Sequence, residues 1–256
     1  MTEPMSYVYA ITRAGGDAGP GEVTGIGDRP VRAVRAAGVV AWVSTVDAAD
    51  FGEEGLREHF EDVRWLESTA RAHNRVIGAV PTPVAPLSLA TVYYSDDRVR
   101  EVLTGRAGEL LEVLDRITGR IEWGVKAFAD PPAETPVEQQ PEEESSKRPG
   151  SAYLERIRRR REGAERHRSD AADRAERLHR QLVALAHASR VLPAQNRELA
   201  KYEGTMVLNG AYLVDADRSA EFREAAHATA ADGGLRAEVT GPWPAYSFAV
   251  IGGEEA

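Results

Sequence analysis

The sequence predicts an α+β protein built from two small domains. Apolar, β-branched segments alternate with segments whose apolar residues recur every three or four positions, so strands and amphipathic helices are mixed along the chain. A segment rich in Pro, Glu, Gln and Ser separates two such halves. The length of 256 residues suits two domains of roughly 100–150 residues each.

The N-terminal half opens with a predicted strand at 7–12, and a second follows at 39–46, where nearly every residue is apolar. One apolar stripe predicts a helix over 56–77, which Pro81 and Pro83 terminate. A strand at 84–94, a helix at 96–118 and a strand at 121–128 complete the predicted domain. This order predicts helices packed on one face of a sheet.

The C-terminal half begins with a long helix over about 151–190. A strand at 205–214, a helix at 219–231 and a strand at 235–240 follow, so the helix–strand–helix–strand order of the first half is repeated. We therefore predict a related α+β domain with a long charged helix at 151–256, an N-terminal domain at 1–130 and a flexible acidic, Pro-rich linker at 131–150.

Composition excludes several classes of function. The absence of cysteine excludes disulfide scaffolds, thiol nucleophiles and cysteine-bound metals. A net charge of −9 argues against general nucleic-acid binding, because phosphate contact needs local positive charge. Neither a signal-peptide pattern nor an apolar run of about 18–20 residues is present, so we expect a cytoplasmic protein without membrane contact.

Catalytic motifs are also absent from the sequence. The six histidines form neither HExxH nor a close pair, and there is no G-x-G-x-x-G after a strand, no Walker A motif and no G-x-S-x-G. We expect no enzyme activity, no cofactor, no metal and no small-molecule substrate. His73 lies on the apolar stripe of its helix and is interpreted as a packed core residue, with an enzyme site formed from dispersed residues around His73 as the alternative.

A basic run, "RIRRRREGAERHR" at 156–168, lies on the long helix. Interleaved glutamates favour a solvated, ion-paired helix face, and no aromatic residues alternate with the arginines to stack on bases. Nucleic-acid binding is the weaker alternative. The candidate charged contact face comprises Arg158, Arg159, Arg160 and Arg161.

The stretch "TGPWPAYSF" at 240–248 concentrates aromatic residues around two prolines. The prolines fix φ and remove two amide donors, so the preceding strand is expected to end at Thr240. We predict a rigid corner that closes the C-terminal sheet; a preorganised patch for a protein partner is the alternative. The candidate core or partner-binding residues are Pro242, Trp243, Pro244, Tyr246 and Phe248.

This stretch, together with "NGAYLV", "YVYAI", "ARAHNRVI" and "PLSLATVY", resembles the gas vesicle protein F/L family over nearly the whole chain outside the linker. Ser88 departs from the pattern, since many members carry Arg there. The resemblance implies a modified ferredoxin-like first domain. It also implies a non-enzymatic accessory or minor structural protein of gas vesicles in the cytoplasm. Its expected partners are the small apolar shell protein and other gas vesicle accessory proteins.

Overall fold

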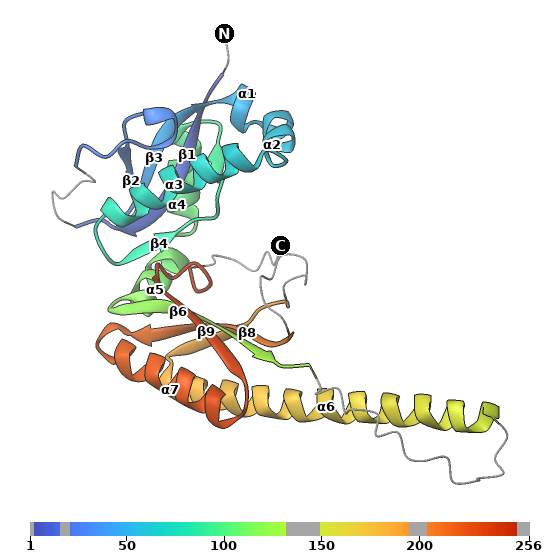
Figure 1. Ribbon diagram of the computed structural model, residues 1–256. Coiled ribbons are helices and arrows are strands. Elements are labelled where there is room, and N and C mark those ends of the chain that lie inside the picture. Colours follow the sequence, from blue (N-terminus) through green and yellow to red (C-terminus); the bar gives the residue numbers. More distant parts are fainter. Residues whose placement is uncertain (1–2, 16–20, 132–148, 195–203, 250–256) are drawn as a thin grey trace. The chain divides into compact units, whose positions relative to one another are not determined.

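A computed structural model describes residues 3–15, 21–131, 149–194 and 204–249 (Figure 1). The chain divides into two compact units, one of residues 1–122 with 242–256 and one of residues 123–241. Each unit has its own sheet, and both sheets contain antiparallel strand pairs. The predicted α+β class with two parts is therefore confirmed.

The sheet of the first unit has the order β2-β3-β1-β4, and β5 also pairs with β1. Its central strand β1 is irregular between Val8 and Ala10, where a bulge shifts the register against β3. A two-residue turn with positive φ at Ala37 and Gly38 joins β2 to β3. The strands are β1 (Pro4–Arg13), β2 (Arg32–Ala36), β3 (Val39–Asp47), β4 (Val84–Pro86) and β5 (Val92–Tyr93).

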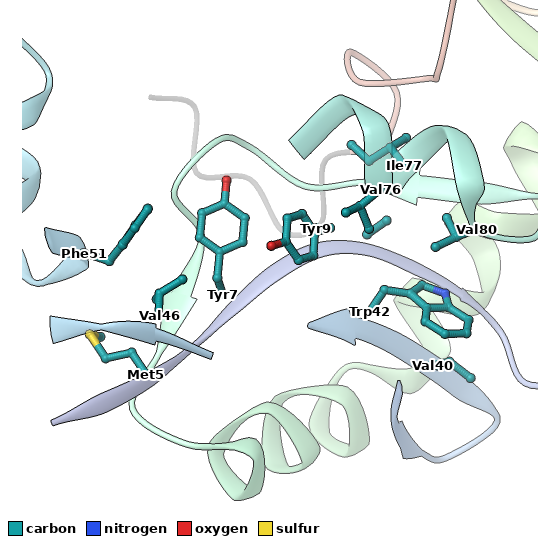
Figure 2. Packing of buried hydrophobic residues seen from close by; sticks show 11 residues of the cluster. Met5, Tyr7, Tyr9, Val40, Trp42, Val46, Phe51, Val76, Ile77 and Val80 are labelled. Carbon is teal, nitrogen blue, oxygen red and sulfur yellow. The ribbon is translucent and has the colours of Figure 1, made fainter. Parts of the chain in front are cut away.

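Helices cover both faces of this sheet, whereas the sequence predicted one covered face. Tyr7 faces α3 and is hydrogen-bonded to its His73, while the neighbouring Ser6 donates to Asp96 at the start of α4 on the opposite face. In Figure 2, α3 and α4 likewise lie on opposite sides of the strands. The helices are α1 (Ala48–Phe51), α2 (Glu53–His59), α3 (Val63–Ala79), α4 (Asp96–Gly105) and α5 (Ala107–Ile117).

The core on the α3 face is aromatic (Figure 2). The rings of Tyr7 and Tyr9 lie 4.8 Å apart, and Phe51 meets Tyr7 edge-on at 5.4 Å. The buried polar atoms of the cluster are satisfied: Trp42 Nε1 donates to the Thr12 hydroxyl at 3.0 Å. Burial and these hydrogen bonds together determine which side chains of β1 and β3 point toward α3.

The sheet of the second unit has the order β7-β8-β6-β9. Strand β6 covers the segment at 121–128, which the sequence analysis assigned to the N-terminal sheet. That assignment is corrected: both edges of β1 are already occupied, and the partners of β6 come from residues beyond 200. The strands are β6 (Arg120–Ala129), β7 (Ala188–Val191), β8 (Thr205–Asp215) and β9 (Arg236–Trp243).

Among the described residues, the long helix α6 (Pro149–Leu185) packs mainly through its second half. Ala171, Ala175, Leu178 and Leu182 are buried against β8 and α7 (Ser219–Asp232). The described side chains from 158 to 166 are exposed except at Gly163. The small side chains of Ala171 and Ala175 permit a close approach of α6 to the rest of the unit.

Several predicted boundaries shift. The helix expected at 56–77 is interrupted at 60–62, where Asp62 caps α3 by accepting hydrogen bonds from the amides of Arg64 and Trp65. The strand expected at 84–94 is divided into β4 and β5. Most of the predicted linker at 131–150 lies outside the described residues, and the predicted domain limits, 1–130 and 151–256, differ from the two compact units.

Candidate functional site

The first residues of the segment at 240–248 do not have the predicted structure. Strand β9 continues through Pro242 to Trp243 instead of ending at Thr240. Strand β9 lies at the edge of its sheet, where a residue without an amide hydrogen does not interrupt a ladder on both sides. The prolines therefore do not stop the strand.

Beyond Pro244 the chain forms a short turn. The Tyr246 amide donates to the Pro244 carbonyl at 2.7 Å, and the Ala249 amide donates to the Ala245 carbonyl at 2.8 Å. This short turn brings three consecutive residues, Tyr246 to Phe248, against the first unit.

Side chains and backbone of this turn are anchored on the first unit, not on the C-terminal sheet. The Tyr246 hydroxyl donates to Asn74 Oδ1 at 2.8 Å. The Ser247 amide and hydroxyl both donate to the Glu122 carboxylate, each at 2.7 Å. Arg116 donates to the Phe248 carbonyl at 2.8 Å. Four hydrogen bonds thus hold the turn, two of them to a carboxylate.

The five candidate residues of this segment divide into two groups. Phe248 is buried and Tyr246 is half-buried against the aromatic core of the first unit. Trp243 is 53% exposed and lies between Pro242 and Pro244. Phe248 is therefore a core residue, whereas about half of the Trp243 side chain is exposed on the surface.

His73 lies beside this anchor and is enclosed by polar partners. Its Nε2 donates to the Leu87 carbonyl at 3.1 Å, which leaves Nδ1 of the neutral ring to accept from the Tyr7 hydroxyl at 2.9 Å. The Tyr7 hydroxyl in turn accepts from the Ala90 amide at 3.0 Å. The ring of Tyr246 stacks at 6.5 Å from that of His73.

Burial sets the charge of these groups. It lowers the pKa of His73 to about 4, although the bond to Leu87 offsets part of the effect. Burial also raises the pKa of Tyr246 to about 12 and that of Tyr7 above its usual range. Near neutral pH the cluster is therefore uncharged, and its hydroxyls remain donors.

This geometry gives no support to the alternative of an enzyme site around His73. The side chain is 2% exposed, and both ring nitrogens are engaged by the protein. Among the described residues, no group of three or more His, Asp or Glu side chains is arranged to hold a metal ion. His73 organises the core between α3 and the loop before β5.

The loop after β4 closes through its backbone. The Ser88 carbonyl accepts from the amide of Thr91 at 3.3 Å and from its hydroxyl at 2.8 Å. Ala90 adopts a positive φ of 63°, which turns its amide toward Tyr7. The turn that carries the Ser88 departure thus forms without a side-chain bond from residue 88 in the described structure.

The four candidate arginines on α6 also divide into two pairs. Arg158 and Arg159 form ion pairs with Glu162 at 2.8 Å and Glu155 at 3.4 Å. Arg160 and Arg161 are exposed and form no ion pair with another described residue. The ion-paired half agrees with a solvated helix face.

Sequence reasoning missed the residues that anchor the C-terminal turn. Glu122 lies in the apolar segment of β6, and a carboxylate at such a position is the one signal that could have indicated a buried polar contact. Asn74 and Arg116 lie on helices among many exposed polar residues and gave no such signal. Their partners, Tyr246 and Phe248, are each more than 120 residues away in sequence.

Fold and site together describe a two-unit α+β protein whose C-terminal segment anchors one aromatic group and exposes another. Crystal structures of two proteins share this fold. The gas vesicle protein GvpF from Anabaena sp. PCC7120 has a TM-score of 0.65 at 19% identity, with 97% of each chain covered. GvpF from Microcystis aeruginosa has a TM-score of 0.64 at 18% identity, covering 96% of this chain and 99% of that one.

Sequence comparison extends the likeness from fold to family. A family model described as gas vesicle synthesis protein GvpL/GvpF matches residues 5–250. Gas vesicle protein L of Streptomyces sp. (strain CB03234) is 41% identical over 259 residues, covering 99% of this chain and 96% of that protein. The chain belongs to the gas vesicle synthesis protein GvpL/GvpF family and is involved in gas vesicle formation. The described helices include none with the length and apolar character of a membrane span.

Proposed function

We propose that the protein is an accessory or minor structural protein that binds the small apolar shell protein of gas vesicles and assists its assembly. It acts at the gas vesicle, in the cytoplasm, and its further partners are other gas vesicle accessory proteins. Membership of the family supports a role in gas vesicle formation.

An apolar shell subunit exposes hydrophobic surface before it is assembled and is then prone to aggregate. A protein that holds such a subunit needs an apolar contact on a soluble surface. With 29% charged residues and a net charge of −9, this chain has a strongly charged composition. Trp243 supplies the apolar contact.

The observation that carries the proposal is the exposure of Trp243 between two prolines. The flanking Pro242 and Pro244 restrict the backbone, and the turn at 245–249 is hydrogen-bonded to the first unit. The tryptophan is thus presented at a low entropic cost. Tryptophan is also the residue type that most often dominates binding energy at interfaces.

The test is coproduction of the protein with the shell protein, followed by measurement of the shell protein that stays in solution and coelutes. We expect the wild type to retain it and Trp243→Ala to retain about tenfold less. Tyr94→Ala removes another exposed aromatic residue of the first unit and should behave as the wild type. If Trp243→Ala retains as much shell protein as the wild type, Trp243 is not the contact. If the wild type retains no shell protein, the proposed function is wrong.

A further inference from the structure

A second surface lies on the other unit, at the base of the exposed part of α6. Here α6, the end of β6 and the start of β8 enclose a hollow of about 500 Å³. Its lining is mostly apolar, from Ala129, Pro131, Ala164, Ala171 and Val207, with His167 at one side. The His167 Nε2 donates to the Asp130 carbonyl at 2.9 Å, which fixes the ring against the end of β6.

Helical spacing places two of the four arginines on the side of α6 that faces this hollow. Arg160 and Arg161 lie four and three residues before Ala164, and Arg168 and Ala171 follow it at steps of four and three, so all five lie toward one side of the helix. Ala164, Arg168 and Ala171 line the hollow, which identifies that face.

The other two arginines, Arg158 and Arg159, fall outside this spacing, and glutamates of the same helix neutralise them. The run of four arginines is thus two pairs with different surroundings. Of these four arginines, Arg160 and Arg161 form no ion pair with a described residue, so they add positive charge next to an apolar surface that Arg168 also lines.

We propose that this face of α6, from Ile157 to Ala171, is a docking surface for an acidic amphipathic helix of a partner protein. The apolar stripe of the partner enters the hollow beside Ala164 and Val207, and its carboxylates meet Arg160, Arg161 and Arg168. The face is about 20 Å long, which matches about four turns of a helix.

Charge complementarity selects this occupant. The run at 156–168 contains seven arginines and two glutamates in a chain with a net charge of −9, so it is a local exception to the charge of the protein. Nucleic acid fits less well, because no Phe, Tyr or Trp among the described residues lines the hollow to stack on a base and its lining is mostly apolar.

The probe is a synthetic peptide of about three heptads with leucine at positions a and d and glutamate at the exposed positions. Binding to the full-length protein is followed by fluorescence anisotropy at about 0.15 M salt. We expect saturable binding that weakens by about tenfold in R160E/R161E and in A164W, which fills the hollow. A peptide of the same composition without the leucine stripe should not bind.

The matched control is R158E/R159E, which changes the net charge by the same amount on the other side of the helix. It should bind the peptide within about twofold of the wild type, and circular dichroism should show that all three variants remain folded. If both double variants lose binding equally, the peptide responds only to the net charge of the helix, and the proposal is wrong.

Three further results would also overturn it. One is tighter binding of a DNA duplex than of the peptide, and another is tighter binding of phosphatidylserine vesicles. The third is peptide binding only after deletion of residues 132–148, because the chain's own five glutamates there would then be the occupant. None of these measurements involves Trp243, so the proposed shell-protein contact can fail or hold independently.

Discussion

Trp243 and Phe248 lie five residues apart and have different surroundings. The ring of Phe248 is 7% exposed, so Phe248→Ala should lower the free energy of unfolding by roughly 3–5 kcal/mol. Trp243 is 53% exposed, so Trp243→Ala should cost less than about 1 kcal/mol. Urea unfolding of both variants measures the difference, and similar losses would show that Trp243 is part of the core.

His73 makes stability depend on pH. Its pKa is about 4 in the folded protein and about 6.5 when unfolded, so the unfolded chain binds the extra proton first as the pH falls. The stability from this group is complete above about pH 6.5 and is lost toward pH 4, by up to about 3 kcal/mol. In His73→Asn this part of the pH dependence should be absent.

The same substitution removes two buried hydrogen bonds, to Tyr7 and to the Leu87 carbonyl. We expect it to lower the free energy of unfolding at pH 7 by roughly 1–3 kcal/mol. Denaturant titrations of both proteins between pH 4 and 7 give both numbers. A fully stable His73→Asn protein that no longer supports gas vesicle formation would instead assign His73 to a functional site.

At the scale of single elements, the N-cap of α3 offers a direct test. Asp62 accepts hydrogen bonds from the Arg64 and Trp65 amides at 2.9 and 3.4 Å, so Asp62→Ala should destabilise the protein by about 1 kcal/mol. The neighbouring Glu61 is exposed and does not cap the helix, so Glu61→Ala serves as the control. Equal melting temperatures for the two variants would contradict the assigned cap.

Elements with a strong local pattern were predictable from the sequence. The apolar stripe of α3 and the buried segment of β3 are visible without a structure, whereas the helix break at 60–62 is not, because Phe60 continues the stripe. Strand β2, "RAVRA", was not predicted, because its two arginines obscure the alternation of apolar and polar residues. The turn that follows it has Ala37 at a position where Asn or Asp would have indicated a hairpin. Short-range patterns thus predicted most helices and strands, but with errors in the residues at which they begin and end.

Long-range pairing could not be predicted in the same way. The sequence contains no signal that β6 joins β8 and β9, or that Tyr246 bonds to Asn74 across 172 positions. The aromatic character of the segment at 240–248 was evident, but which ring is buried depends on that distant partner. The sequence therefore indicated the aromatic segment, but it did not indicate which of its rings is buried and which is exposed.

At the scale of the whole molecule, the pairing of β6 changes what cleavage of the chain should do. A specific protease site inserted within the predicted linker at 131–150 would leave β6 on the first fragment and its partners β8 and β9 on the second. We therefore expect the cleaved fragments to coelute in native buffer and to separate only in denaturant. Fragments that separate in native buffer would support two independent domains with limits at 130 and 151.

The proposed function requires a protein that folds normally and still exposes Trp243. The most direct measurement is gas vesicle formation in cells whose only copy of this protein carries Trp243→Ala, with Tyr94→Ala as the control. We predict that the Trp243→Ala protein accumulates in folded form while gas vesicles are largely lost, and that the control forms them normally. Normal gas vesicles in the Trp243→Ala cells would contradict the assignment of this exposed tryptophan as the contact through which the protein works.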